Sequence, residues 1–112
     1  MRIPLFKLVL TREAEDFLRS LPLPARDKMA HNIQRIAKGE RNSDIFKKLE
    51  NTEIWESRTL FNKTAYRLFA FWDTDGETLV IATHGIIKKT QKTPAKEIAK
   101  AEAVRKAYFK NK

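Results

Sequence analysis

The chain has 112 residues, of which 42% are hydrophobic and 11 are aromatic, enough to form the core of one compact domain. Cysteine is absent and only two histidines occur, which excludes a disulfide framework and makes a zinc site unexpected. The net charge of +9 is uneven, because residues 88–112 hold nine basic and only two acidic side chains.

This basic end has two interpretations. It can be a solvated helix that keeps the protein soluble, or a patch for nucleic acid or an acidic protein; a pI near 10 in so small a domain favours the patch. No apolar run is long enough to span a bilayer, and the first residues lack the small-residue cleavage site of a signal peptide. The sequence therefore predicts a cytoplasmic protein with no membrane partner.

The first half of the chain predicts one strand and two helices. Residues 5–10 are rich in β-forming residues, and Thr11 is the expected N-cap of a helix that has acidic residues in its first turn. Pro22 and Pro24 end that helix, and a second is expected from about Ala25 to Gly39. We expect the two helices to form an antiparallel hairpin packed on a sheet.

The second half predicts a sheet and a last helix. Residues 40–52 are expected to be a connection that exposes Lys47 and Lys48. Residues 53–92 are typical of a three-stranded antiparallel meander with a turn near Asp75–Gly76. Thr93 is the expected N-cap of the last helix, followed by proline. The predicted order is β-α-α-β-β-β-α, an α+β fold with helices on one side of a largely antiparallel sheet.

Cations occupy unusual places in this meander. Arg58 lies late in its first strand, Arg67 lies inside the apolar run YRLFAFW, and Lys88, Lys89 and Lys92 follow its third strand. Burying an unpaired charge is costly, so these residues need a partner or a function. Because a meander places its strands side by side, the sequence predicts that the cations converge on an anion, and so basic a chain favours a phosphate.

Glu56 and Arg58 share one side of their strand by the two-residue period. The pair is either a salt bridge or a base held beside an oxyanion clamp. Cleavage of RNA by its own 2′-OH needs a base, an acid and cations that stabilise the phosphorane, and it needs no metal. Arginine suits the cationic role, and lysine can transfer a proton where neighbouring cations lower its pKa.

Three runs carry a family resemblance: IWESR, AYRLFAFW and VIATHGIIKKTQKTPAKEIAKAEAVRKAY. In this order they resemble the RelE/ParE superfamily of type II toxin–antitoxin toxins, closest to the HigB-like, phage-derived branch. The resemblance covers about residues 50–108, with Ile86 where the family usually has phenylalanine. It implies a RelE-like fold in a single domain over residues 1–112.

The resemblance also implies a function. Such a toxin is a ribosome-dependent, metal-independent endoribonuclease without a cofactor, inhibited by a cognate, DNA-binding helix-turn-helix antitoxin. RelE has lysine where this chain has Glu56, and His84 is an alternative acid or base, so the general base stays open. The implied catalytic residues are Glu56, Arg58, Arg67, Lys88 and Lys89, and the implied RNA or phosphate contacts are Lys47, Lys48, Lys92, Lys96 and Tyr108.

Two other functions remain open. The same fold carries ParE-like proteins that inhibit DNA gyrase without catalysis, so the fold cannot decide between them. The chain can also be an inactive remnant or a plain RNA-binding module. The full set of cations favours the nuclease.

Overall fold

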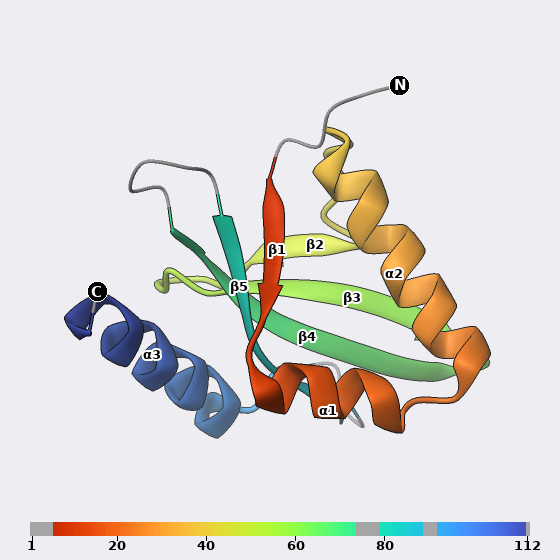
Figure 1. The fold of residues 1–112 in the computed structure, drawn as a ribbon. Coiled ribbons are helices and arrows are strands. Elements are labelled where there is room, and N and C mark those ends of the chain that lie inside the picture. The colour runs from red at the N-terminus through yellow and green to blue at the C-terminus, as the bar shows by residue number, and fades with distance from the viewer. Residues whose placement is uncertain (1–5, 74–78, 89–91, 112) are drawn as a thin grey trace.

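A computed structural model describes residues 6–73, 79–88 and 92–111 (Figure 1). One strand and two helices are followed by four strands and a last helix. They are β1 (Lys7–Leu10), α1 (Arg12–Ser20), α2 (Leu23–Ala37), β2 (Phe46–Lys48), β3 (Trp55–Phe61), β4 (Thr64–Asp73), β5 (Leu79–Lys88) and α3 (Ala95–Lys110).

The strands form one five-stranded sheet in the order β1-β5-β4-β3-β2. β1 pairs with β5 in parallel and all other pairs are antiparallel, which confirms the predicted α+β class and the meander of β3, β4 and β5. The prediction that residues 40–52 only connect was wrong, because Phe46–Lys48 pairs with β3 as the edge strand β2. A strand of three residues is too short to show the two-residue alternation that predicts a strand from sequence. The expected turn at Asp75–Gly76 lies outside the described residues.

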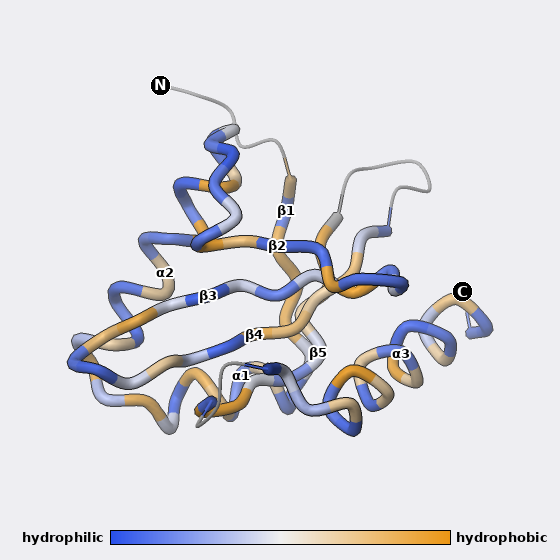
Figure 2. Tube along the Cα trace, turned by 180° about the vertical axis from the view of Figure 1, so that it is seen from behind, coloured by the Kyte–Doolittle hydropathy of each residue, from blue (hydrophilic) through white to orange (hydrophobic). Residues whose placement is uncertain are grey.

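The helices cover both faces of the sheet. α1 and α2 pack on one face, through Ala14, Leu21, Ala25, Met29, Tyr66, Leu68 and Ala82. α3 covers the other face, through Leu49, Ile54, Phe69, Phe71, Ile81 and Ala101. The prediction of helices on one side was therefore wrong. Consecutive apolar residues along β4, visible as its orange stretch in Figure 2, require cover on both faces.

The start of α1 agrees with the sequence, whereas the arrangement of the two N-terminal helices does not. Thr11 is the N-cap of α1, and its hydroxyl accepts from the Ala14 amide at 3.1 Å. α2 begins at Leu23 rather than Ala25, because Pro24 is tolerated in the first turn. In place of a hairpin, α1 lies on β5 and α2 on β3 (Figure 1).

In the described ranges, no helix is long and apolar enough to cross a bilayer.

Gly85 allows α1 to approach β5 closely. A Cβ atom at this position would lie 2.2 Å from the ring of Phe17. Gly85→Ala is therefore expected to destabilise the protein by about 1–3 kcal/mol through overpacking. Adding Phe17→Leu should recover part of the loss. Urea unfolding of the two variants tests this, and a Gly85→Ala protein as stable as the wild type would contradict the close contact.

Candidate functional site

The strand register gathers polar side chains on the face that carries α3. Arg58 of β3 is directly opposite Arg67 of β4, Lys47 of β2 is opposite Glu56, and Lys88 ends β5 opposite Ala65. Since side chains alternate between the faces of a sheet, the five polar residues share the face of Phe69 and Phe71. We call Lys47, Glu56, Arg58, Arg67 and Lys88 the polar cluster.

Glu56 lies at the centre of the polar cluster, and its side chain is fully buried. Its Oε1 accepts from Arg58 Nε at 2.8 Å and lies 3.2 Å from Arg67 Nε, while its Oε2 accepts from the Thr93 hydroxyl at 2.6 Å. Burial raises the pKa of Glu56, but the hydrogen bonds from Thr93 and Arg58 and the charges of the two arginines lower that pKa overall. The carboxylate is therefore ionised at neutral pH.

Thr93 has a different function from the one predicted. The N-cap residue of α3 is Pro94, so the prediction of Thr93 as N-cap was wrong. The Thr93 hydroxyl instead donates to Glu56, 37 residues earlier in the chain. This bond ties the start of α3 to the polar cluster. Sequence reasoning missed it because no local pattern relates two residues so far apart.

The two arginines both face Glu56 through Nε, and among the described residues the terminal nitrogens of neither guanidinium group donate to the carboxylate. Arg67 Nε is an ion-pair partner without good hydrogen-bond alignment, and its Nη1 donates to the Tyr66 carbonyl at 3.2 Å. Within the described ranges, the Nη atoms of Arg58 donate no hydrogen bond, and its side chain is 25% exposed. Two guanidinium groups held in this way can bind an added anion through forked donors.

Lys88 contributes a third cation and is largely buried. Burial lowers its pKa, repulsion by Arg67, Arg58 and Lys47 lowers it further, and Glu56 opposes the shift. The crowding of cations that the sequence suggested is thus present around this lysine. A lysine with a lowered pKa can exchange a proton near neutral pH more readily than an ordinary one.

The other predicted lysines have different positions. Lys47 is exposed on the face of the polar cluster, and Lys92 and Lys96 are exposed on either side of Thr93, which contacts that cluster. Lys48 points to the opposite face by the strand period and lies 3.8 Å from Glu53. Lys89 lies outside the described residues.

Tyr108 is not brought to the polar cluster. It lies near the C-terminal end of α3, where its ring packs edge-on against Phe71 and its hydroxyl donates to Asp73. Phe71 is four residues beyond Arg67 along β4, a distance of about 13 Å at the rise of a strand. The structure thus places Tyr108 in the core between α3 and the sheet.

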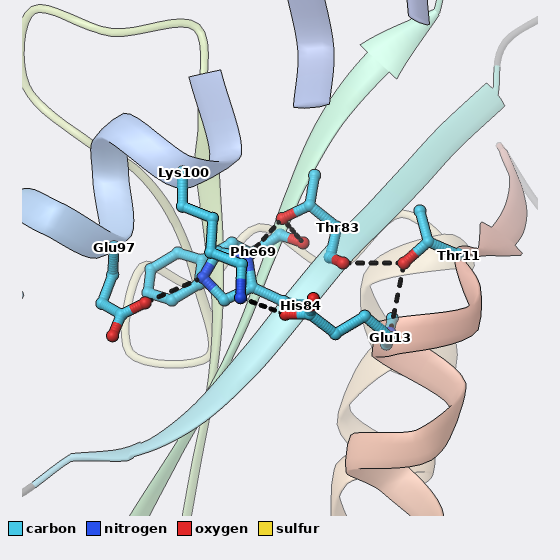
Figure 3. Close-up of polar contacts among 8 residues, drawn as sticks. Thr11, Glu13, Phe69, Thr83, His84, Glu97 and Lys100 are labelled. Carbon is cyan, nitrogen blue, oxygen red and sulfur yellow. Dashed lines mark hydrogen bonds and ion pairs between the residues drawn. The ribbon is translucent and has the colours of Figure 1, made fainter. Parts of the chain in front are cut away.

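His84 belongs to a separate network that connects α1, β5 and α3 (Figure 3). Its Nδ1 lies 2.9 Å from the Thr83 hydroxyl and its Nε2 lies 3.1 Å from Glu97. The Thr83 carbonyl in turn accepts from the Thr11 hydroxyl at 2.7 Å. The ring is buried and both of its nitrogens have partners within this network.

The network makes stability depend on pH. Burial lowers the pKa of His84; Glu97 and Glu13 oppose this shift and Lys100 adds to it. Below about pH 6.5 the unfolded chain takes up a proton that the folded protein excludes, so stability should fall between about pH 7.5 and 5.5. Urea unfolding across this range should give a flatter profile for His84→Gln. Equal slopes in both proteins would contradict the assignment of the effect to His84.

The fold and the site define a small basic α+β protein that holds two arginines and a lysine around a buried carboxylate on one face of its sheet. Residues 16–106 match the family described as "Phage derived protein Gp49-like (DUF891)". The chain belongs to this family, which is a family of RelE-like toxins, and the superfamily predicted from the sequence is confirmed.

The chain was also compared with solved structures and with curated proteins. In the crystal structure of the toxin–antitoxin complex RelBE2 from Mycobacterium tuberculosis, one chain is 20% identical to this protein, with a TM-score of 0.49. The match covers 77% of this chain and 100% of the other. Comparison with curated proteins gave no significant match.

Proposed function

We propose that this toxin is an endoribonuclease that cleaves mRNA on the ribosome and so inhibits translation in the cytoplasm. The observation that carries the proposal is the buried Glu56 carboxylate, which holds two guanidinium groups by their Nε atoms beside a lysine of lowered pKa. Such a site offers preorganised positive charge to a phosphate whose charge increases in the transition state. It supports metal-independent cleavage by the neighbouring 2′-OH.

The residues of the polar cluster receive different roles in this proposal. Arg58 and Arg67 stabilise the phosphorane through their terminal nitrogens, which do not donate to Glu56. Lys88 transfers a proton, as its lowered pKa allows. Lys89 follows Lys88 directly in the sequence, and we assign it to the same site on this ground alone.

Glu56 is assigned as a positioning residue rather than the general base. Its side chain has no exposed surface, and both of its oxygens are engaged, by Arg58 and Thr93. A general base must come within hydrogen-bond distance of the hydroxyl that it deprotonates. A carboxylate covered by its own partners does not meet that requirement, whereas it does fix the orientation of both arginines.

Binding of the RNA backbone is assigned to the exposed lysines near the polar cluster. Lys47, Lys92 and Lys96 neutralise phosphates and release counterions, which makes binding depend on salt. Lys48 and Tyr108 are left out of this surface, because one faces the other side of the sheet and the other lies in the α3 core.

The expected partner that restrains the toxin is a cognate antitoxin with a helix-turn-helix DNA-binding domain. An antitoxin segment that adds a helix or strand over the polar cluster would block access of RNA to the arginines. The whole chain, residues 1–112, is proposed to act as one toxin domain.

The direct test is cleavage of a defined mRNA by the purified protein, with and without programmed ribosomes, in the presence and absence of EDTA. We expect cuts within codons only when ribosomes are present, and no cuts in free RNA with or without EDTA. Absence of cuts together with stalled gyrase–DNA complexes in a parallel assay would overturn the proposal in favour of gyrase inhibition.

A further inference from the structure

The face of the sheet opposite the polar cluster carries an aromatic pocket. It has a volume of about 420 Å³, and its lining includes the rings of Phe6, Phe46, Trp55 and Trp72 and the segment 39–43 that follows α2. Phe46 and Trp55 are stacked with ring centroids 4.8 Å apart, and Trp72 meets both edge-on, at 6.4 and 6.2 Å. The rings of Phe46, Trp55 and Trp72 are only partly buried. We call this site the aromatic pocket.

The polar rim of the aromatic pocket favours an anionic ligand. Glu40 is the acidic residue of the lining, and it is neutralised by an ion pair with Arg35. Arg41 is exposed and makes no ion pair among the described residues, and Asn42 and Ser43 add polar groups. A planar ligand that carries a negative charge fits flat rings beside a guanidinium, and an unpaired nucleotide has this chemistry.

The position of the aromatic pocket relates it to the polar cluster. Phe46 and Lys47 are neighbours on β2, and Trp55 and Glu56 are neighbours on β3. Because side chains alternate along a strand, the aromatic residue of each pair projects to one face of the sheet and the charged residue to the other. β2 is the edge strand of the sheet. One edge strand, about 5 Å wide, thus separates the two sites, and a single strand of RNA can contact both by passing around it.

We propose that the aromatic pocket binds an unpaired nucleotide of the same RNA strand that the polar cluster holds. The inference rests on the proposed function for the role of the polar cluster, whereas the pocket itself can be tested without catalysis. Stacking on aromatic rings tolerates every base, so the pocket adds affinity and direction to the strand without a strict sequence preference.

The chain provides its own reporter for the test. Its only two tryptophans, Trp55 and Trp72, both line the aromatic pocket. Intrinsic fluorescence of the full chain, measured without ribosomes, should be quenched by adenosine monophosphate and, at lower concentration, by the single-stranded RNA decaadenylate. If neither adenosine monophosphate nor decaadenylate quenches the fluorescence, the proposal is overturned. If purified antitoxin quenches it and neither of these two probes does, the pocket binds a protein instead.

Two variants examine the aromatic pocket while keeping both tryptophans. Phe46→Ala removes one stacking surface and should weaken the binding of both probes at least about tenfold. Arg41→Glu changes only an exposed side chain, so it remains informative if Phe46→Ala fails to fold, and it should weaken binding by a similar factor. Arg12→Glu is the matched control, with the same charge change at an exposed position on α1. Affinities unchanged in both pocket variants would overturn the proposal.

A third variant tests whether one strand reaches both sites. Arg67→Ala should abolish the advantage of decaadenylate over the mononucleotide and leave the affinity for adenosine monophosphate unchanged. An equal loss of affinity for both probes, or no loss for either, would overturn the inference that one RNA strand contacts both sites. Quenching by RNA in a protein that cuts no mRNA would refute the nuclease and keep the pocket, whereas cutting without quenching would do the reverse.

Discussion

Replacing Arg67 with alanine is expected to reduce ribosome-dependent mRNA cleavage at least about a hundredfold, the usual cost of removing one preorganised donor to a developing negative charge. Arg67 lies opposite Arg58 in the β3–β4 pair, and Glu56 contacts both through Nε. Its loss removes one of two guanidinium groups that can contact the phosphorane. Single-turnover cleavage on programmed ribosomes measures the effect directly.

Two controls separate the charge of Arg67 from its shape and from the charge of the whole protein. Arg67→Lys keeps the positive charge but loses the fork of donors, so it should recover only part of the rate. Arg12→Ala removes an exposed charge from α1, on the other face of the sheet, and should cleave like the wild type. Binding of antitoxin by Arg67→Ala would show that the variant is folded. Wild-type cleavage by Arg67→Ala would refute the assigned site.

Local patterns were sufficient to predict most of the elements. The two-residue period that places Glu56 and Arg58 on one face of β3 and the Thr11 cap are local, and both are confirmed in the structure. What failed depends on distant packing. β2 has three residues and exists because β3 pairs with it, and α3 crosses to the second face because β4 is apolar on both sides. The consecutive apolar residues Leu68–Phe71 carried that signal.

The candidate site was predictable to the extent that it follows from the strand register. A meander places Arg58 beside Arg67, and the two-residue period places Glu56 on the same face. The orientation of Lys48 could not be derived without knowledge of β2. The bond from Thr93 to Glu56 and the remoteness of Tyr108 depend on where α3 lies, which no spacing in the sequence determines.

Removing the charge of Glu56 is expected to have the largest effect on stability. Glu56→Ala leaves two guanidinium groups and Lys88 close together without their counter-charge, and breaking a buried ion pair in this way costs about 3–5 kcal/mol. Glu56→Gln keeps the shape and a hydrogen bond to Thr93, so it should lose less. Urea unfolding of the three proteins at neutral pH measures both effects.

The pH dependence of stability gives an independent measure of the same carboxylate. Because the folded pKa of Glu56 is lowered, its contribution is complete above the ordinary carboxyl pKa near 4.5 and is lost as the pH falls through the lower folded value. Wild-type stability should therefore fall on acidification below about pH 4.5, and Glu56→Gln should lack that part of the decline. Identical acid profiles would contradict an ionised Glu56 in the folded protein.

Cleavage by Glu56→Gln separates a positioning residue from a general base. The charge of Glu56 raises the pKa of Lys88, so its removal should move the Lys88-dependent limb of the pH–rate profile to lower pH. Misaligned arginines should lower the rate, but the pH–rate profile should keep its acidic limb. If Glu56 were the base, Glu56→Gln would lose the acidic limb altogether, whereas the Lys88 limb would shift in either case. Loss or retention of the acidic limb therefore decides which role the buried carboxylate has.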